Sequence, residues 1–101
     1  MSSVDHELRL ALSTGRVQLG SNTAERELRR GRARIVILSS NIPEEKAETI
    51  KRYGNLSDIP VLEHNKDSID LGVLCGNPYP VSAIIINDPG DSRIMDLVEE
   101  Q

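Results

Sequence analysis

Two short apolar runs constrain what this 101-residue chain can fold into more than any other feature of its sequence. Ile35–Leu38 is wholly apolar, and Val81–Ile86 is apolar except for Ser82. Both runs are too short for helices and rich in β-branched residues, so they are predicted to be strands. A strand that is apolar on both faces is buried on both faces. We therefore expect these strands side by side at the centre of a sheet that helices cover on both sides.

The segments around these two strands alternate between helical and extended patterns. Shorter strands are predicted at Val17–Leu19 and Val61–Leu62, and stretches with apolar residues at helical spacing separate the strands. This alternation predicts an α/β fold, a three-layer α/β/α sandwich with a four-stranded sheet. The first two strands along the chain are joined by a helix and should run parallel. Their carboxyl ends should then meet at one edge, where open α/β sheets bind ligands.

Length and composition favour one globular domain that spans residues 1–101. The chain has no Trp and no Phe, so its core must be aliphatic. Its single cysteine, Cys75, excludes an internal disulfide and a cysteine-rich zinc site. No apolar run approaches the roughly 20 residues that span a bilayer, and no signal-peptide pattern opens the chain. We therefore expect a soluble intracellular protein without a membrane contact.

The net charge of −4 conceals an uneven distribution. Residues 1–52 hold ten Lys and Arg against seven Asp and Glu, a net charge of +3, whereas residues 53–101 hold two against nine, a net charge of −7. A local basic patch can contact phosphates even on a protein whose total charge is negative. The acidic second half equally suits a protein-interaction module.

The stretch from Gly20 to Gly31 combines several features of an anion-binding site. Gly20 suits a tight turn, and Asn22 is predicted to cap the helix that follows, with Glu25 completing a capping box. Gly31 is predicted to end that helix in a left-handed conformation. The helix carries three arginines, Arg26, Arg29 and Arg30. Its exposed N–H groups and these cations favour a phosphate-bearing partner, while a solvated face balanced by neighbouring glutamates is the alternative.

Two further segments could join this stretch at the same edge of the sheet. The segment after the strand at 35–38 carries Ser40 and Asn41. Asn41 has capping-box spacing to Glu44, at the start of the next helix. The segment before the last strand carries Pro78, Tyr79 and Pro80. An aromatic ring on a rigid, exposed loop can stack on a base or sugar, and a lid packed on the core is the alternative.

Residues that could carry enzyme chemistry are few and scattered. No glycine-rich loop ends in Lys-Ser or Lys-Thr, which disfavours a nucleoside triphosphatase. Cys75 has apolar neighbours, which favours an unreactive packed thiol, and His64 is expected on a surface loop. The segment Asp88–Ser92 lacks the remaining ligands of a calcium loop and is predicted to be a turn. We therefore expect no enzyme activity, no metal ion and no cofactor.

Several motifs together resemble one family of ribosomal proteins. They are Glu7–Arg9, Thr14–Arg16, Leu19-Gly20, Gly31, Arg34–Ile37, Asn41, Ile59–Val61, Leu71-Gly72, Gly76 and Asp88–Ile94. On these residues the chain resembles, from Val4 to Met95, the thirty-e ribosomal protein of the archaeal and eukaryotic large subunit. That family belongs to a superfamily of small kink-turn RNA-binding proteins. The proline-rich segment 77–80 and the acidic tail resemble archaeal members more than eukaryotic ones.

The resemblance implies a mixed four-stranded sheet and three loops that meet at one RNA-binding rim. Gly20 matches the family's close-approach glycine, while Asn41 and Tyr79 match a polar and an aromatic position in the other two loops. The superfamily's Gly-x-Asn-(Glu/Thr)-x-x-Lys pattern is matched at Asn22, Thr23 and Arg26. The candidate RNA-binding residues are Gly20, Ser21, Asn22, Thr23, Arg26, Arg29, Arg30, Ser40, Asn41, Pro78, Tyr79 and Pro80. Close relatives often carry Lys or Arg at position 22 or 23, where this chain is neutral.

We therefore predict a structural protein of the large ribosomal subunit, located in the cytoplasmic ribosome and monomeric when free. Its expected partners are kink-turn ribosomal RNA and other ribosomal proteins. A kink-turn presents sheared G·A pairs, whose edges side-chain amides and cations can read. The alternatives are an extraribosomal kink-turn regulator or adaptor, a protein-interaction module of the same fold, and a small-ligand α/β domain. Asn22 can either cap its helix or read RNA.

Overall fold

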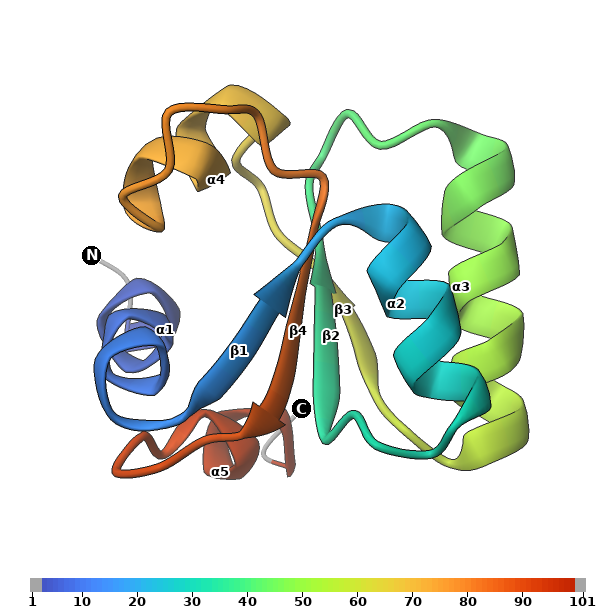
Figure 1. The fold of residues 1–101 in the computed structure, drawn as a ribbon, viewed down its shortest axis with the longest axis horizontal. Coiled ribbons are helices and arrows are strands. Elements are labelled where there is room, and N and C mark those ends of the chain that lie inside the picture. The colour runs from blue at the N-terminus through green and yellow to red at the C-terminus, as the bar shows by residue number, and fades with distance from the viewer. Residues whose placement is uncertain (1–2, 100–101) are drawn as a thin grey trace.

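The computed structural model describes residues 3–99, which form a four-stranded sheet with helices on both faces (Figure 1). The strands are β1 (Arg16–Leu19), β2 (Ile35–Leu38), β3 (Val61–Glu63) and β4 (Ala83–Asp88). The helices are α1 (Ser3–Thr14), α2 (Ser21–Arg29), α3 (Glu44–Ser57), α4 (Ser68–Leu74) and α5 (Ile94–Glu99). The two apolar runs are therefore strands, as predicted.

The sheet has the strand order β1-β4-β2-β3. β4 pairs antiparallel with both β1 and β2, whereas β3 pairs parallel with β2. The two apolar strands are the central neighbours, with Ile35 opposite Ile86 and Leu38 opposite Ala83. β1 and β2 run parallel, as expected, although β4 lies between them. The sheet is mixed because β4 alone runs against the other three strands.

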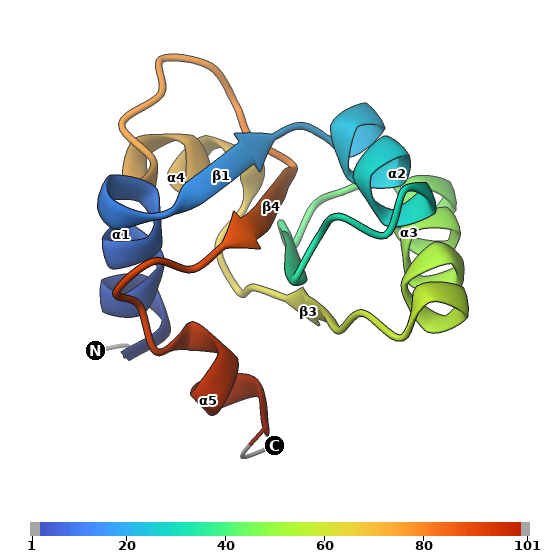
Figure 2. The same ribbon diagram turned by 60° about the horizontal axis from the view of Figure 1, so that its bottom comes forward.

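Alternate side chains of the two central strands build a separate core on each face of the sheet. On the face covered by α1, α4 and α5, the core residues are Leu8, Ala11, Ile35, Ile37, Leu71, Val81, Ile84, Ile86 and Ile94. On the face covered by α2 and α3, they are Ala24, Leu28, Ala33, Val36, Leu38, Ile50, Ala83 and Ile85. Figure 2 shows the two groups of helices on either side of the strands. The predicted three-layer sandwich is confirmed.

One edge of the sheet brings three loops together. β1 and β2 end there and β4 begins there, so the segments that follow β1 and β2 lie beside the segment that precedes β4 (top of Figure 1). The Gly20 N–H donates to the Ala83 carbonyl at 2.9 Å, and the Ser39 N–H donates to the Ser82 carbonyl at 2.9 Å. We call this surface the three-loop rim. It consists of residues 20–23, 39–41 and 77–82.

The last strand begins two residues later than predicted, at Ala83 rather than at Val81. The Val81 N–H donates to the Ser68 carbonyl at 2.9 Å, and this bond ties Val81 to α4 instead of to a neighbouring strand. The apolar side chain of Val81 is nevertheless buried in the core. The strand was predicted to begin too early because hydrophobicity alone does not distinguish a buried loop residue from a strand residue.

Asp67 caps α4, because its Oδ1 accepts a hydrogen bond from the Asp70 N–H at 2.9 Å. We expect Asp67→Ala to lower the free energy of unfolding by about 1 kcal/mol, since an N–H group at the helix start loses its acceptor. Urea denaturation followed by circular dichroism measures this loss. Asp67→Asn retains the acceptor oxygen and should recover most of the stability. An alanine variant as stable as the original protein would contradict the assigned cap.

Candidate nucleic-acid interface

The first turn of α2 forms one part of the rim. Gly20 is the residue at the helix cap position, with a φ of 114° that favours glycine, and none of the described side chains caps the helix. The predicted capping box of Asn22 and Glu25 is therefore wrong, because the helix begins at Ser21, two residues earlier than a cap at Asn22 requires. The N–H groups at the start of α2 are left for an external acceptor such as a phosphate.

Lys46 of α3 holds the Asn22 side chain. Its Nζ donates to Asn22 Oδ1 at 2.6 Å and lies 3.5 Å from Glu25 Oε2. The Asn22 oxygen is thus occupied, whereas its Nδ2 has no hydrogen-bond partner among the described residues and can donate to a ligand. Sequence reasoning missed Lys46, since nothing in its local pattern indicates that α3 packs against α2. Lys46 also adds the positive charge that positions 22 and 23 lack.

The second part of the rim is the segment after β2. The predicted capping box of Asn41 and Glu44 is wrong, because Pro43 occupies the cap position of α3 and no side chain within residues 3–99 caps that helix. Asn41 instead bonds to Ser68: its Oδ1 accepts from the Ser68 N–H at 2.8 Å, and its Nδ2 donates to Ser68 Oγ at 3.3 Å. These bonds tie the segment to the start of α4.

The third part of the rim is the loop that carries Tyr79. The Tyr79 side chain is 70% exposed, so it is available to a ligand and is not a packed lid. The loop rests on α4 at Gly72, whose carbonyl accepts from the Asn77 N–H at 2.8 Å. A Cβ at Gly72 would lie 2.4 Å from the Tyr79 carbonyl, which shows how closely the loop approaches the helix backbone. Pro78 and Pro80 flank Tyr79 in the sequence and are also exposed.

The structure does not bring all the predicted arginines to the rim. Arg26 is exposed in the middle of α2, with its Nε 3.6 Å from Glu27 Oε2. Arg29 and Arg30 lie at the other end of the helix, about 12 Å along its axis from Ser21. Arg29 lies over the Tyr53 ring, 5.8 Å from its centroid. Arg26 lies beyond the rim, one helical turn after Asn22. The rim itself combines the remaining candidates: Gly20, Ser21, Asn22, Thr23, Ser40, Asn41, Pro78, Tyr79 and Pro80.

A polar network beneath the rim connects it to α1. The expectation that His64 lies on the surface is wrong: its side chain is only 7% exposed, and its Nε2 lies 2.6 Å from Asp5 Oδ1. The Lys66 N–H donates to His64 Nδ1 at 3.0 Å, so Nε2 carries the ring proton and donates to Asp5. The Lys66 carbonyl in turn accepts from the Ser40 N–H at 2.9 Å. This chain of bonds positions the segment that contains Ser40.

The Asp5 carboxyl makes stability depend on pH. Burial acts to raise the pKa of Asp5, but the hydrogen bonds from His64 and Lys66, together with the positive charge of Lys66, outweigh burial and hold the pKa below its ordinary value of 3.8. The stabilisation is therefore complete above that value and is lost as the pH falls through the lower pKa of the folded state. We expect the difference in unfolding free energy between the original protein and Asp5→Asn to shrink below pH 3.8. If this difference in unfolding free energy stayed constant over the same pH range, the hydrogen-bond network around Asp5 would be contradicted.

The rest of the described chain offers little for catalysis. Burial raises the pKa of the Cys75 thiol, which disfavours the reactive thiolate. No group of three or more His, Cys, Asp or Glu that could hold a metal ion occurs among residues 3–99. Within the same residues no helix is long and apolar enough to cross a membrane.

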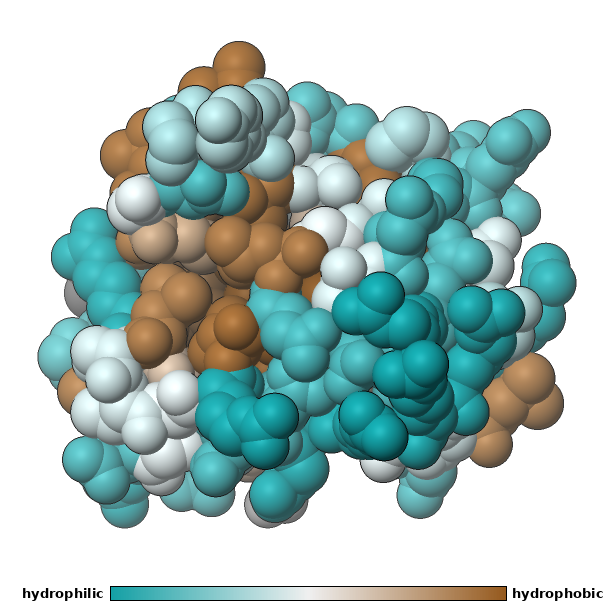
Figure 3. All heavy atoms as spheres, viewed as in Figure 1, coloured by the Kyte–Doolittle hydropathy of each residue, from teal (hydrophilic) through white to brown (hydrophobic). Residues whose placement is uncertain are grey.

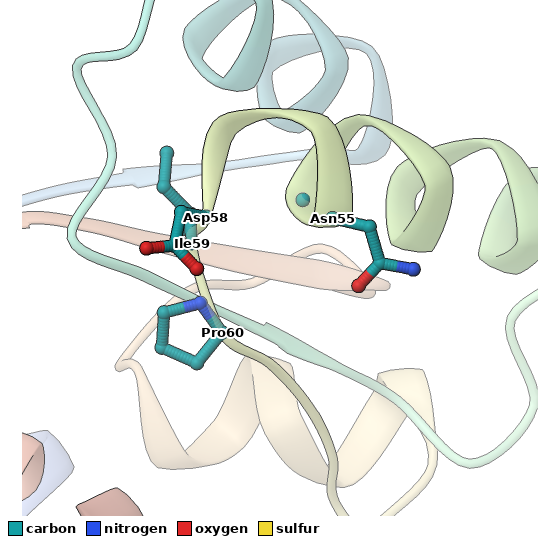
Figure 4. Close-up of a pocket in the computed structure, with 5 residues that line it drawn as sticks. Asn55, Asp58, Ile59 and Pro60 are labelled. Carbon is teal, nitrogen blue, oxygen red and sulfur yellow. The ribbon is translucent and has the colours of Figure 1, made fainter.

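A pocket of about 240 Å³ lies at the end of α3 away from the rim (Figure 4). It is lined by Gly54, Asn55, Asp58, Ile59 and Pro60. Asp58 has a φ of 59° and ends the helix, with its N–H donating to the Asn55 carbonyl at 3.3 Å. The pocket therefore lies where α3 ends, and the left-handed backbone of Asp58 accounts for that helix end.

Comparison with known proteins agrees with this architecture. A model of the ribosomal protein L7Ae/L30e/S12e/Gadd45 family matches residues 2–96. The large ribosomal subunit protein eL30 of Methanothermobacter thermautotrophicus is 44% identical over 94% of this chain and 97% of its own length. The eL30 protein of Methanobrevibacter smithii is 43% identical over 95% and 97%, and that of Methanocaldococcus jannaschii is 42% identical over 97% and 89%. The chain belongs to the L7Ae/L30e/S12e/Gadd45 family of ribosomal proteins.

Proposed function

We propose that this protein is a structural constituent of the large ribosomal subunit and binds kink-turn ribosomal RNA through the three-loop rim. The proposal that the protein binds RNA rests on one observation: three loops meet around the start of α2, which none of the described side chains caps. Its relatives over nearly the whole chain are named large ribosomal subunit proteins, and the family consists of ribosomal proteins rather than enzymes. The protein accordingly acts in the cytoplasmic ribosome without enzyme activity or cofactor.

The chemistry of the rim suits a kink-turn. Asn22 Nδ2 is a donor that can meet the O6 or N7 acceptors of a guanine in a sheared G·A pair. The N–H groups at the start of α2 can bind a phosphate, and Arg26 and Lys46 add positive charge on the same side. Gly20 has no side chain that would keep the RNA backbone away. Tyr79 can stack on an exposed base.

We further propose that residues 1–101 act as one RNA-binding domain and that the free protein is a monomer. Ribosomal RNA is the main partner, and neighbouring ribosomal proteins contact the surface outside the rim. In the part of the chain that the structure describes, 17 buried apolar residues form two cores on one shared sheet, which supports a single folding unit.

Binding to matched RNAs tests the function. Calorimetry at constant salt should detect tight binding to a kink-turn RNA and at least tenfold weaker binding to a variant whose G·A pairs are replaced by Watson–Crick pairs. Equal affinity for both RNAs would contradict kink-turn recognition. Co-sedimentation with large ribosomal subunits separates the ribosomal role from that of an extraribosomal regulator, which would bind kink-turn RNA but remain outside the subunit.

A further inference from the structure

A second group of cations lies at the edge of the sheet opposite the rim. Arg16 begins β1, Arg30 follows α2, and the other members, Arg32 and Arg34, lie in the segment that leads into β2. We call these four residues the arginine edge. All four are exposed, and within residues 3–99 none of them forms an ion pair. Four unpaired guanidinium groups on a protein of net charge −4 are suited to an anionic partner.

The arginine edge borders a pocket of about 340 Å³ between β1, the end of β4 and α2. The pocket is lined by Arg16, Gln18, Glu27, Arg32 and Asn87. In the view of Figure 3, hydrophilic residues cover the region of α2, whereas apolar residues gather between α1, β1 and α4. All five lining residues of the pocket are polar or charged, and two of them, Arg16 and Arg32, are cations.

The wall of the pocket contains a buried acceptor without a donor. Glu27 is 3% exposed, and its Oε1 accepts from Asn87 Nδ2 at 3.0 Å. The same Nδ2 lies 3.3 Å from the Arg32 carbonyl. These bonds fix the orientation of the amide, and they leave Asn87 Oδ1 buried without a hydrogen-bond partner in the described part of the chain. A buried acceptor left in this way is costly, so a ligand that donates an O–H or N–H would satisfy it.

We propose that this pocket and the arginine edge bind a second RNA segment, as a single-stranded or looped-out nucleotide. Arg16 and Arg32 hold its phosphates, because the planar guanidinium group matches phosphate geometry. The ribose 2′-OH donates to Asn87 Oδ1, and this contact distinguishes RNA from DNA. The protein can then hold two RNA segments at once, one at the rim and one at the opposite edge.

The acidic groups around the pocket favour RNA over an acidic protein segment. Arg26 lies 3.6 Å from Glu27 and partly offsets its charge. Asp88, which pairs with Arg16 in the sheet, has its Oδ1 occupied by the Gly90 N–H at 2.9 Å. An Asp or Glu side chain of a partner would supply acceptors alone, whereas a ribonucleotide supplies a hydroxyl donor next to its phosphate.

The test uses the full chain saturated with kink-turn RNA, so that the rim is occupied. Fluorescence anisotropy then follows the binding of a labelled single-stranded oligoribonucleotide without secondary structure. Arg16→Gln with Arg32→Gln should weaken this second binding at least tenfold. It should also reduce the salt slope by about 1.4, as expected for two phosphate contacts on a single strand. The matched control is Arg9→Gln with Arg52→Gln, which removes the same charge from two exposed arginines on α1 and α3.

The proposal would be overturned if the original protein formed no ternary complex with the two RNAs, or if both double variants lost the same affinity for the labelled oligoribonucleotide. It would also be overturned if polyglutamate displaced the labelled oligoribonucleotide more strongly than unlabelled RNA does. A deoxyribonucleotide of the same sequence should bind the original protein more weakly, and Asn87→Ala should abolish that difference. If kink-turn RNA fails to bind the rim, the same titration on the free protein still tests the second site separately.

Discussion

A protein in which Asn22 and Arg26 are both replaced by alanine is expected to bind kink-turn RNA about 3 kcal/mol more weakly, roughly a 150-fold loss of affinity. Asn22 presents its Nδ2 donor to the ligand, and Lys46 holds the amide in place through a hydrogen bond of 2.6 Å to Oδ1. Arg26 supplies an exposed guanidinium group on the same helix. Each contact to a base edge or phosphate contributes about 1–3 kcal/mol, and neighbouring contacts add less than fully.

Calorimetry at one salt concentration measures this loss, with circular dichroism as the check that the fold is intact. The chain offers a matched control in Arg52→Ala with Asn55→Ala, because both residues are exposed on α3 and have the same side-chain types. The control should change the binding free energy by less than about 0.5 kcal/mol. If the two double variants lost affinity equally, the loss would reflect the charge of the whole protein, and the rim would not be the RNA site.

The largest expected effect on stability is that of Gly15→Ala, at about 3 kcal/mol. A Cβ at Gly15 would lie 2.0 Å from the Asp88 carbonyl oxygen and 2.8 Å from the Pro89 carbonyl carbon. Both obstacles are backbone atoms, which a rotamer change cannot move, so the turns after α1 and after β4 would have to separate. Overpacking in such sites costs about 1–3 kcal/mol, and a contact this short belongs at the upper end.

Urea denaturation of Gly15→Ala beside Gly31→Ala separates overpacking from backbone strain. Gly31 has a φ of 69°, but a Cβ there would meet no atom of the described residues within 4 Å. Gly31→Ala should therefore cost only about 1 kcal/mol, the penalty of the left-handed backbone. Similar losses in the two variants would contradict the close approach of the two turns at Gly15.

Most of the fold could be predicted from the sequence, because the strongest patterns in the sequence are local. β2 is a wholly apolar run, and its four residues are all buried. Gly31 ends α2 as predicted, with its own N–H donating to the Leu28 carbonyl at 3.1 Å and the Arg32 N–H donating to the Glu27 carbonyl at 3.0 Å. Patterns of this kind depend only on residues a few positions apart, which a sequence displays directly.

The side-chain partners at the rim could not be predicted in the same way. Asn22 and Asn41 both have the spacing of helix caps, yet one bonds to Lys46, 24 residues away, and the other bonds to Ser68, 27 residues away. His64 follows a strand end and looks exposed, but it is buried against Asp5, 59 residues away. These contacts depend on how helices pack on the sheet, and periodicity does not specify that packing.

Chemical-shift mapping of the protein by NMR during titration with kink-turn RNA locates the RNA-binding surface residue by residue. We expect the largest amide shifts at Gly20–Thr23, Ser40, Asn41 and Tyr79. Arg52 and Asn55, on the exposed face of α3, should change little. Large shifts concentrated on that face of α3, with the rim amides unchanged while RNA binds, would contradict the assignment of the RNA-binding surface to the three-loop rim.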